Sequence, residues 1–458
     1  LGIGYALKNY KVYSVNCIYP LLTIQIIILF FLNQTPVSAM LINPIAEQFA
    51  MGQDTARSIS HLFIIYSFIL FIYLFNALCF VPVGHMISRL MAPIEGLTAY
   101  GLNLIGSLLG IFLFLILSFL WFPPTIWILI SYLLFIIINA KNKNKNLISG
   151  LCVILVVTLL SSFVKDKKQT IYSPYQNISI EQLTTPLNPI IIQTSHLFYQ
   201  ALLNLSEDLY FERKDRVKGN IFGYHVDVEH EREFYNLPHL ISPILPKKIM
   251  IVGSGAGNDV AAANRFNIND IDAVEIDPVI AELGKQYHPE LPYNNINVNL
   301  FIDDARSFIK NNQAQYDTII YGLLDSQTNL SSKGGIRLDS YVYTIEAFEE
   351  AKKVLKNDGI MCLSFFVQTP ELGFKLLKML EKVFGHKPLV LKSELNDRYV
   401  FIAKKNIESK LNIDDLKYFK KTEVFDKIHV YDVDLSTDDW PFFYMPYKVY
   451  PLTYLFIV

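Results

Sequence analysis

The sequence predicts an α-helical transmembrane region fused to an α/β domain, with a small strand-rich subdomain between them. Three observations lead to this fold class. Long apolar runs fill the first part of the chain, short alternating stretches follow, and strands then alternate with helices from residue 246. Such alternation requires a mainly parallel sheet covered by helices on both faces. We expect domains at 1–165, 166–245, 246–405 and 406–458, the last segment returning to the membrane.

The composition narrows the class of protein. The chain has 458 residues, of which 52% are hydrophobic, and its net charge is −2. This length suffices for more than one domain, and no basic run mixed with aromatic residues points to a nucleic-acid partner. The cysteines are scattered without a CxxC pair, and the histidines offer only His225 and His230 as a loose pair. The sequence therefore predicts neither a disulfide framework nor a metal site.

Apolar runs in the first part of the chain are expected to cross a membrane. They lie at about 15–32, 61–82, 100–122, 125–140 and 147–163. A run of about twenty residues can span the bilayer core as a helix, and the last two runs are short for this. Buried helices of a large soluble core are the less favoured alternative, because several runs follow one another with short polar joins. The chain begins with Leu1 and stops inside an apolar run, so we expect a fragment that lacks membrane spans at one or both ends.

Periodicity predicts the elements of the remaining chain. Alternating stretches at 176–180 and 224–228 predict short antiparallel strands. Further strands are expected near 249–252, 271–275, 297–302, 317–321, 359–365, 387–392 and 398–403, and helices near 258–265, 278–286, 304–311, 344–356 and 371–383. The last two strands are close enough in sequence to form an antiparallel hairpin at one end of the sheet.

The most informative stretch joins the first strand of this sheet to a glycine turn. The strand runs directly into Gly253, Gly255 and Gly257, and the helix start that follows favours bound polar or negatively charged atoms. Glu275 lies about twenty residues further on, at the tip of the next strand, where a carboxylate can accept both hydroxyls of a ribose. Glycines, spacing and acid together favour binding of a nucleoside cofactor over a purely structural turn.

Further candidate binding and catalytic residues follow the ends of the later strands. Asp304 follows the third strand, where it can accept a hydrogen bond from an adenine amino group or cap a helix. The long loop after the fourth strand includes Asp325 and leads to Tyr341 and Tyr343. Ligands of open α/β sheets bind at this edge, and so many polar and aromatic groups favour a lid over a site. We expect Asp325 to act as the base or to bind the acceptor, with Tyr341 or Tyr343 beside it.

The order of these motifs resembles the spermidine synthase family, the polyamine aminopropyltransferases, and its membrane-fused members in particular. The likeness covers roughly 172–403 and includes the segments 173–176, 231–235, 252–257, 274–277, 304–306, 316–320, 343–348 and 358–359, with further likeness at 82–84 and 99–107. The resemblance implies a Rossmann-like domain of the class I methyltransferase type that binds an adenosyl sulfonium compound without a metal ion. It assigns the ribose acid to Glu275, the adenine acid to Asp304 and a cofactor-contacting glutamine to Gln176.

The sequence departs from the family at three positions. Ala256 stands where the family has an Asp that holds the aminopropyl ammonium, and Gly322 stands where it has the Asp that deprotonates the attacking amine. Asn236 replaces a substrate-side His. A bound polyamine needs several carboxylates, because each unpaired ammonium costs about 1–3 kcal/mol to desolvate. The carboxylate of S-adenosylmethionine, by contrast, is tolerated by a helix N-terminus and glycine N–H groups.

We therefore expect a membrane-bound, spermidine synthase-like transferase that uses S-adenosylmethionine or its decarboxylated form, nominally for aminopropyl transfer to a polyamine. One alternative is a methyltransferase acting on a membrane-proximal acceptor. Another is a non-catalytic membrane sensor or transporter that binds a nucleoside or polyamine. The apolar runs carry no charged residue at mid-span, which is the usual marker of an ion pathway. The expected partners are a small-molecule acceptor and the lipid bilayer, and homo-oligomerisation is left open.

The lysine clusters give conflicting signals about orientation. With five spans, the clusters at 8–11 and 141–145 would mark cytoplasmic loops and place the soluble part outside. The cluster at 165–168 favours a cytoplasmic soluble part. The conflict disappears if 125–163 holds one span and one interfacial helix. We expect an integral membrane protein with its soluble part in the cytoplasm, where adenosyl cofactors are made and kept.

Overall fold

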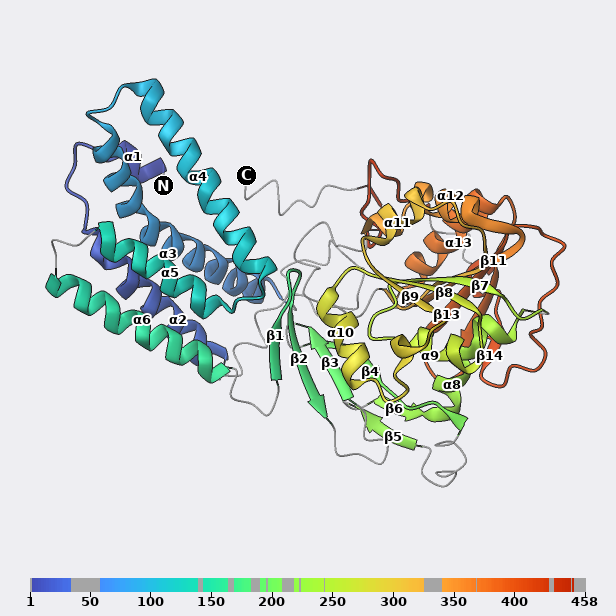
Figure 1. The fold of residues 1–458 in the computed structure, drawn as a ribbon. Helices are drawn as coiled ribbons and strands as arrows, with labels where there is room; N and C mark the ends of the chain where they lie inside the picture. The colour runs from blue at the N-terminus through green and yellow to red at the C-terminus, as the bar shows by residue number, and fades with distance from the viewer. Residues whose placement is uncertain are drawn as a thin grey trace. The chain divides into compact units, whose positions relative to one another are not determined.

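The computed structural model describes most of the chain. The described residues are 2–33, 58–138, 143–163, 169–182, 190–194, 197–207, 218–221, 224–242, 244–324, 340–367, 369–427, 432–445 and 447–448. They form two compact units, and along the described chain the first ends at Tyr175 and the second begins at Gln176. The first unit is mainly helical, and the second contains the α/β domain (Figure 1).

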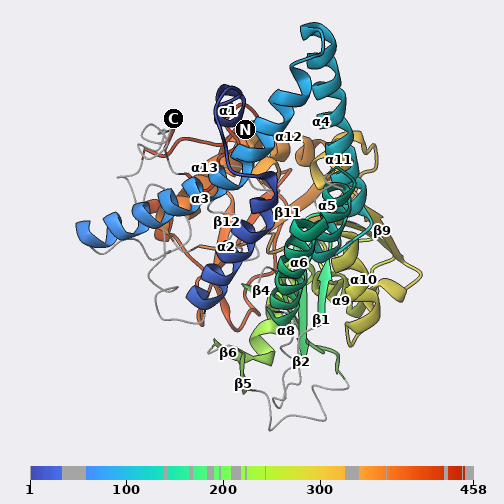
Figure 2. The ribbon, with the colours of Figure 1, turned by 90° about the vertical axis from the view of Figure 1, so that its left-hand side faces the viewer.

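Helices build the first unit. They are α1 (Gly2–Ala6), η1 (Val15–Cys17), α2 (Ile18–Asn33), α3 (Ile59–Met91), α4 (Gly96–Phe119), α5 (Pro124–Ile138) and α6 (Lys143–Phe163), and strand β1 (Gln169–Tyr172) follows them. Ser58 caps the start of α3, because its side chain accepts the backbone N–H of His61 at 3.2 Å. Tyr19 of α2, Phe135 of α5 and Val153 of α6 belong to one buried cluster. Figure 2 shows these three helices side by side.

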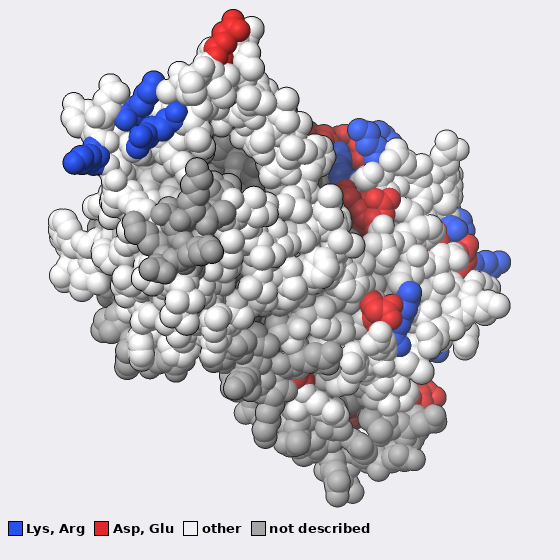
Figure 3. All heavy atoms as spheres, turned by 60° about the vertical axis from the view of Figure 1, so that its left-hand side comes forward, with Lys and Arg blue, Asp and Glu red and all other residues white. Residues whose placement is uncertain are grey.

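The surface of the helical unit is apolar. Among the described residues, Val15–Leu32, Ile59–Met91 and Gly96–Phe119 are long and apolar enough to cross a membrane, whereas α5 and α6 hold shorter apolar stretches. Leu109 of α4 is 64% exposed, and Figure 3 shows a broad surface without charged side chains. An extended apolar surface of this kind is suited to lipid rather than water. The predicted apolar helical region is therefore confirmed.

Short antiparallel strands open the second unit. Strands β2 (Asn177–Gln182), β3 (Ile190–Thr194) and β4 (Leu197–Leu202) pair in sequence order. Strands β5 (Lys218–Ile221) and β6 (Tyr224–Asp227) form a separate hairpin. Ile191 of β3 is fully buried and packs with Leu203 and Val228, as expected for alternating strands with one apolar face.

The main sheet has eight strands in the order β14-β12-β13-β11-β10-β7-β8-β9. Their bounds are β7 (Lys248–Val252), β8 (Asp270–Glu275), β9 (Val298–Ile302), β10 (Tyr316–Tyr321), β11 (Leu355–Phe366), β12 (Leu389–Ser393), β13 (Arg398–Lys404) and β14 (Phe419–Lys421). Strands β9, β8, β7, β10 and β11 are parallel to one another, while β12, β13 and β14 pair antiparallel. The expected mainly parallel sheet with a terminal antiparallel hairpin is confirmed.

Helices cover both faces of this sheet (Figure 1). They are α8 (Val228–Leu240), α9 (Asn258–Arg265), α10 (Pro278–Tyr287), α11 (Ala305–Asn311), α12 (Ile345–Val354) and α13 (Pro370–Phe384), with short turns at η4 (Pro292–Asn294), η6 (Ser340–Val342) and η7 (Val424–Lys427). Phe348 of α12 and Leu376 of α13 pack into the largest apolar cluster. Leu237 of α8 and Val260 of α9 pack into separate clusters. The result is the three-layered, Rossmann-like fold that the sequence predicts.

The strand order reverses beside β7. From β7 the chain adds β8 and then β9 on one side, and it returns to place β10 on the other side. In open α/β sheets ligands bind outside the carboxyl ends of the strands at such a switch point. The ends of β7 and β10 therefore define the place where a site is expected.

Candidate functional site

The glycine turn at the end of β7 has a backbone that only glycine adopts easily. Gly253, Gly255 and Gly257 have φ angles of 65°, 56° and 103°, in the left-handed region where a Cβ atom is strained. The turn is closed by the Gly257 N–H, which donates to the Ser254 carbonyl at 3.0 Å. Gly257 is also the N-cap of α9. The turn thus delivers the chain from β7 to a helix start at the switch point.

Glu275 ends β8 and holds the glycine turn through its carboxylate. One oxygen accepts the backbone N–H of Gly255 at 2.8 Å, and the other accepts that of Asp277 at 2.9 Å. The side chain is buried, and burial raises the pKa of its carboxyl group to about 7, although the backbone donors act in the opposite direction. A carboxylate offers about four acceptor positions. Glu275 can therefore accept a further hydrogen bond from a ligand.

Gln176 lies in the same cluster. Its side-chain amide donates to one carboxylate oxygen of Asp277 at 3.1 Å, and the other oxygen of Asp277 accepts the N–H of Val279 at 3.0 Å. Asp277 thereby caps α10 and positions Gln176 beside the end of β8. The structure brings together Gln176, the glycine turn and Glu275, which the sequence analysis selected separately.

Gln200 of β4 also contacts the glycine turn. Its side-chain oxygen accepts the backbone N–H of Ala256 at 2.9 Å, and a Cβ atom at Gly255 would come within 2.9 Å of the same oxygen. The amide of Gln200 thus covers part of the turn, and the positive φ of Gly255 is what favours glycine there. The sequence pattern did not single out Gln200, because one polar residue in a short alternating strand does not indicate a contact with a distant turn.

Asp304 caps α11. Its carboxylate accepts the N–H of Ser307 at 2.8 Å, and its own N–H donates to Asp303 at 2.8 Å. The helix-capping role that the sequence allowed is therefore present. Contact with an adenine remains a prediction, and the position at the end of β9, two strands from β7, is compatible with it.

The predicted catalytic residues fall in different surroundings. Asp325 lies outside the described residues. Tyr341 is 41% exposed, whereas Tyr343 is fully buried. The ring of Tyr343 stacks on Phe443 at 4.8 Å and meets Phe365 edge-on at 5.8 Å. Tyr343 thus belongs to an aromatic core, and the catalytic roles of all three residues stay predictions.

Gly322 lies directly against the glycine turn. A Cβ atom at this position would be 2.9 Å from a carboxylate oxygen of Asp259 and 3.7 Å from the Gly253 carbonyl. Asp259 is in the first turn of α9 and is partly exposed. Loss of solvent around its carboxyl group raises the pKa of Asp259 to about 7. The sequence analysis missed Asp259, although its position just after the glycines could have singled it out.

Asn236, which replaces a substrate-side His of the resembled family, has a structural partner. It is buried in α8, and its side-chain oxygen accepts from the guanidinium of Arg265 at 3.0 and 3.3 Å. Arg265 also forms an ion pair with Glu290 at 2.7 Å. Asn236 therefore links α8 to α9 behind the glycine turn.

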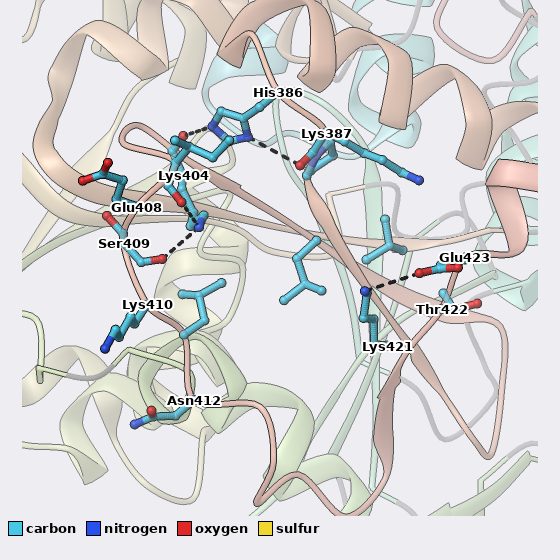
Figure 4. Close-up of a pocket in the computed structure, with 15 residues that line it drawn as sticks. His386, Lys387, Lys404, Glu408, Ser409, Lys410, Asn412, Lys421, Thr422 and Glu423 are labelled. Carbon is cyan, nitrogen blue, oxygen red and sulfur yellow. Dashed lines mark hydrogen bonds and ion pairs between the residues drawn. The ribbon is translucent and has the colours of Figure 1, made fainter.

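A separate hollow of about 750 Å³ lies far along the sheet (Figure 4). It is lined by the start of β12, the end of β13 and the segment that follows, including His386, Lys404 and Lys421. The Lys404 ammonium donates to the Ser409 carbonyl at 2.8 Å across its wall. Because Lys404 pairs with Ile360 near the start of β11, this hollow is at the amino ends of the parallel strands. It is therefore not the ligand edge of the sheet.

No cluster of metal-ligating side chains occurs among the described residues. His230, one of the loosely paired histidines, is buried, with its ring 2.8 Å from the hydroxyl of Ser393. The site is thus built from backbone donors, carboxylates and amides. Together with the parallel sheet, this defines a Rossmann-like α/β domain with a glycine turn and an acid at the next strand.

Comparison with known proteins shows which family this domain is similar to. Residues 228–386 match the spermine/spermidine synthase domain. The matched residues lie within the α/β domain of the second unit. It is similar to the polyamine aminopropyltransferase of Korarchaeum cryptofilum, with 27% identity over 127 residues that cover 27% of this chain and 37% of that protein.

Other relatives give the same picture. The polyamine aminopropyltransferase of Sulfurisphaera tokodaii is 30% identical over 139 residues, which cover 30% of this chain and 42% of the relative. Polyamine aminopropyltransferase 2 of Aquifex aeolicus is 26% identical over 217 residues, which cover 44% of this chain and 41% of the relative. The chain thus spans less than half the length of these curated relatives. Among solved structures, spermidine synthase from Thermotoga maritima aligns with a TM-score of 0.38 at 16% identity, covering 62% of this chain and 85% of that one.

Proposed function

We propose that the second unit binds S-adenosylmethionine or its decarboxylated form and transfers a group from the sulfonium to a small acceptor, nominally an aminopropyl group to a polyamine. The observation that carries this proposal is the Glu275 carboxylate, held against the glycine turn by the Gly255 N–H at 2.8 Å. This arrangement fits a ribose whose hydroxyls donate to a single carboxylate. The matching synthase domain at 228–386 supports the same class of reaction.

The residues proposed to hold the adenosyl compound lie at the ends of β7, β8 and β9, with Gln176 added from just before β2. They are Gln176, Gly253, Gly255, Gly257, Glu275 and Asp304. A sulfonium makes the carbon attached to it electrophilic when the compound is bound. The protein then needs to orient the acceptor and take up one proton. In this proposal Asp325, Tyr341 and Tyr343 remain candidates on the acceptor side.

Charge favours the decarboxylated form as the donor. Carboxylates gather at the ligand edge of the sheet, namely Glu275, Asp277, Asp303 and Asp304. A cationic aminopropyl tail and a cationic amine are stabilised by such a field, whereas the carboxylate of S-adenosylmethionine is repelled. These acids offset the absence of a carboxylate at Ala256.

Methyl transfer from S-adenosylmethionine is the second candidate. It is favoured by Ala256, which is fully buried and places no charge beside the glycine turn. The start of α9 can accommodate an anionic group there. The acceptor would then be a membrane-proximal molecule, in keeping with the apolar helices of the first unit.

The same proposal places the protein in a membrane. Three described helices are long and apolar enough to span one. We propose that the soluble unit faces the cytoplasm, where the adenosyl donor is made. A cysteine-accessibility assay in intact cells, with single cysteines introduced at exposed sites of the α/β domain, tests this orientation. Labelling by an impermeant reagent from outside would contradict it.

Calorimetry on the full chain in detergent tests the binding proposal. We expect decarboxylated S-adenosylmethionine to bind at least tenfold more tightly than S-adenosylmethionine. This difference in affinity corresponds to about 1.4 kcal/mol of binding free energy. Incubation with putrescine and mass analysis of the acceptor then separates aminopropyl from methyl transfer. Failure of both compounds and of methylthioadenosine to bind would overturn the proposal.

A further inference from the structure

The residues that meet at the switch point are Asp259 and Gly322. Asp259 belongs to the first turn of α9, which follows β7, and Gly322 is the first residue after β10. Strands β7 and β10 are neighbours in the sheet, with Val252 paired to Tyr321 at their ends. The carboxylate of Asp259 therefore projects towards the place where an open α/β sheet receives its ligand.

The glycine at 322 is explained by space rather than by backbone conformation. Among the described glycines with positive φ are those of the turn after β7, and Gly322 is not one of them. Its φ is thus outside the left-handed region that favours glycine. A Cβ atom at 322, however, would be 2.9 Å from the Asp259 carboxylate oxygen, closer than such atoms normally approach. Gly322 thus leaves room for the carboxylate of Asp259.

The Asp259 carboxylate takes little part in holding the fold together. Within the described part of the chain, no other side chain forms a hydrogen bond or ion pair with Asp259. Arg265, on the same helix, instead pairs with Glu290 at 2.7 Å. A carboxyl group that has lost much of its solvent and has no side-chain partner is costly to stability. Such groups are found where a ligand supplies the missing interaction.

We propose that Asp259 faces the acceptor amine and takes up its proton during transfer, an inference that rests on the proposed function. The acceptor nitrogen forms a bond to the carbon attached to sulfur, and the carbon–sulfur bond breaks. Sulfur keeps the electron pair and becomes a neutral thioether. The proton released by the nitrogen passes to the Asp259 carboxylate, so that charge and atoms balance.

The acidity of Asp259 suits this task. Its pKa is raised to about 7, chiefly by desolvation and against the weaker effect of Arg265. The other titratable groups that interact with it are Tyr235 of α8 and Tyr293 of η4. Both have raised pKa values and remain neutral near pH 7, so neither tyrosine changes charge while the Asp259 carboxyl group titrates. A base is most effective when its pKa lies near the working pH.

The test compares Asp259→Asn with wild type, as full chains in detergent. We expect kcat to fall at least about 100-fold, in line with the usual contribution of a general base, while the donor binds within about twofold. The rising limb of the pH profile of kcat/KM near pH 7 should become shallower, because the variant keeps only the titration of Glu275, whose pKa is also about 7. Glu282→Gln, at an exposed position of α10, is the matched control and should behave as wild type.

A second variant guards against a folding artefact. Gly322→Ala places a Cβ atom against the Asp259 carboxylate and should lower kcat while leaving donor binding and the thermal unfolding midpoint unchanged. If Asp259→Asn turns over within about threefold of wild type, far below the general-base contribution, the inference is overturned and the proposed function stands. If wild-type protein binds no adenosyl compound, both fail.

Discussion

The Glu275 carboxylate accepts the backbone N–H of Gly255 at 2.8 Å, across 20 positions of sequence. This bond joins the tip of β8 to the turn after β7. The acid that stabilises the turn is also the acid that we propose to bind a ribose. Stability of the turn and affinity for the adenosyl donor should therefore depend on the same carboxylate.

The first prediction concerns Glu275→Gln. An amide presents one acceptor and one NH₂ group, so it cannot accept both backbone N–H groups that the carboxylate accepts. We expect donor affinity to fall about 10–100-fold, equivalent to losing a charge-assisted hydrogen bond of about 1.5–3 kcal/mol. The thermal unfolding midpoint should fall as well. Calorimetry and a thermal scan measure these effects, and unaltered affinity would show that Glu275 serves the turn alone.

The second prediction separates the two roles of Asp304. Asparagine caps helices as well as aspartate does, whereas alanine loses about 1 kcal/mol. Asp304→Asn should therefore preserve the stability of α11 but weaken donor binding about tenfold, because its NH₂ group would face the adenine amino group. Asp304→Ala should lose both. If Asp304→Asn binds the donor as wild type does, the residue is a helix cap and nothing more.

The third prediction concerns the Arg265–Glu290 pair, whose side chains are 11% and 10% exposed. Arg265→Met removes the guanidinium from the Asn236 side-chain oxygen and leaves the Glu290 carboxylate with the Leu205 N–H but without its ion-pair partner. This change should cost about 3–5 kcal/mol of unfolding free energy. Adding Glu290→Leu should restore part of the loss. Lys378→Met removes an exposed pair with Glu381 and should cost less than about 1 kcal/mol. Equal losses for the two single variants would contradict this assignment.

The fourth prediction concerns pH. His239 is buried, and neither ring nitrogen has a hydrogen-bond partner among the described residues. Desolvation lowers the pKa of its imidazole to about 3 from its usual 6.5. Because the folded pKa is depressed, the stability contributed by the neutral ring is present above pH 6.5 and is lost as pH falls towards 3.

Comparison of wild type with His239→Leu isolates this effect. Between pH 7.5 and pH 4.5, wild type should lose about 2–3 kcal/mol more unfolding free energy than the variant, since one pKa unit is worth 1.36 kcal/mol. Thermal unfolding of both proteins at the two pH values gives the difference. Parallel losses in the two proteins would mean that His239 is accessible to protons in the folded state.

Local sequence patterns were enough to predict the architecture. The alternation of strands and helices depends on side-chain periodicity, and the glycine turn depends on backbone freedom, so both could be predicted without knowledge of distant contacts. The same holds for Glu275, because the length of one strand–helix–strand unit places it beside the turn. The spacing of Asp304 also predicted its capping role, which depends on Ser307 only three residues away.

The tertiary structure decided which side chains share the site. Gln200 reaches the Ala256 N–H across 56 positions of sequence, and Asp259 meets Gly322 only because β7 and β10 are neighbours. The ring of Tyr343, which the sequence predicted beside Asp325, is packed on Phe443 in the core. Strand order arises from the burial of apolar surface over the whole domain, which no short stretch of sequence encodes. The sequence by itself therefore determined the class of fold and the glycine turn, and only the packed sheet decided which distant groups lie against that turn.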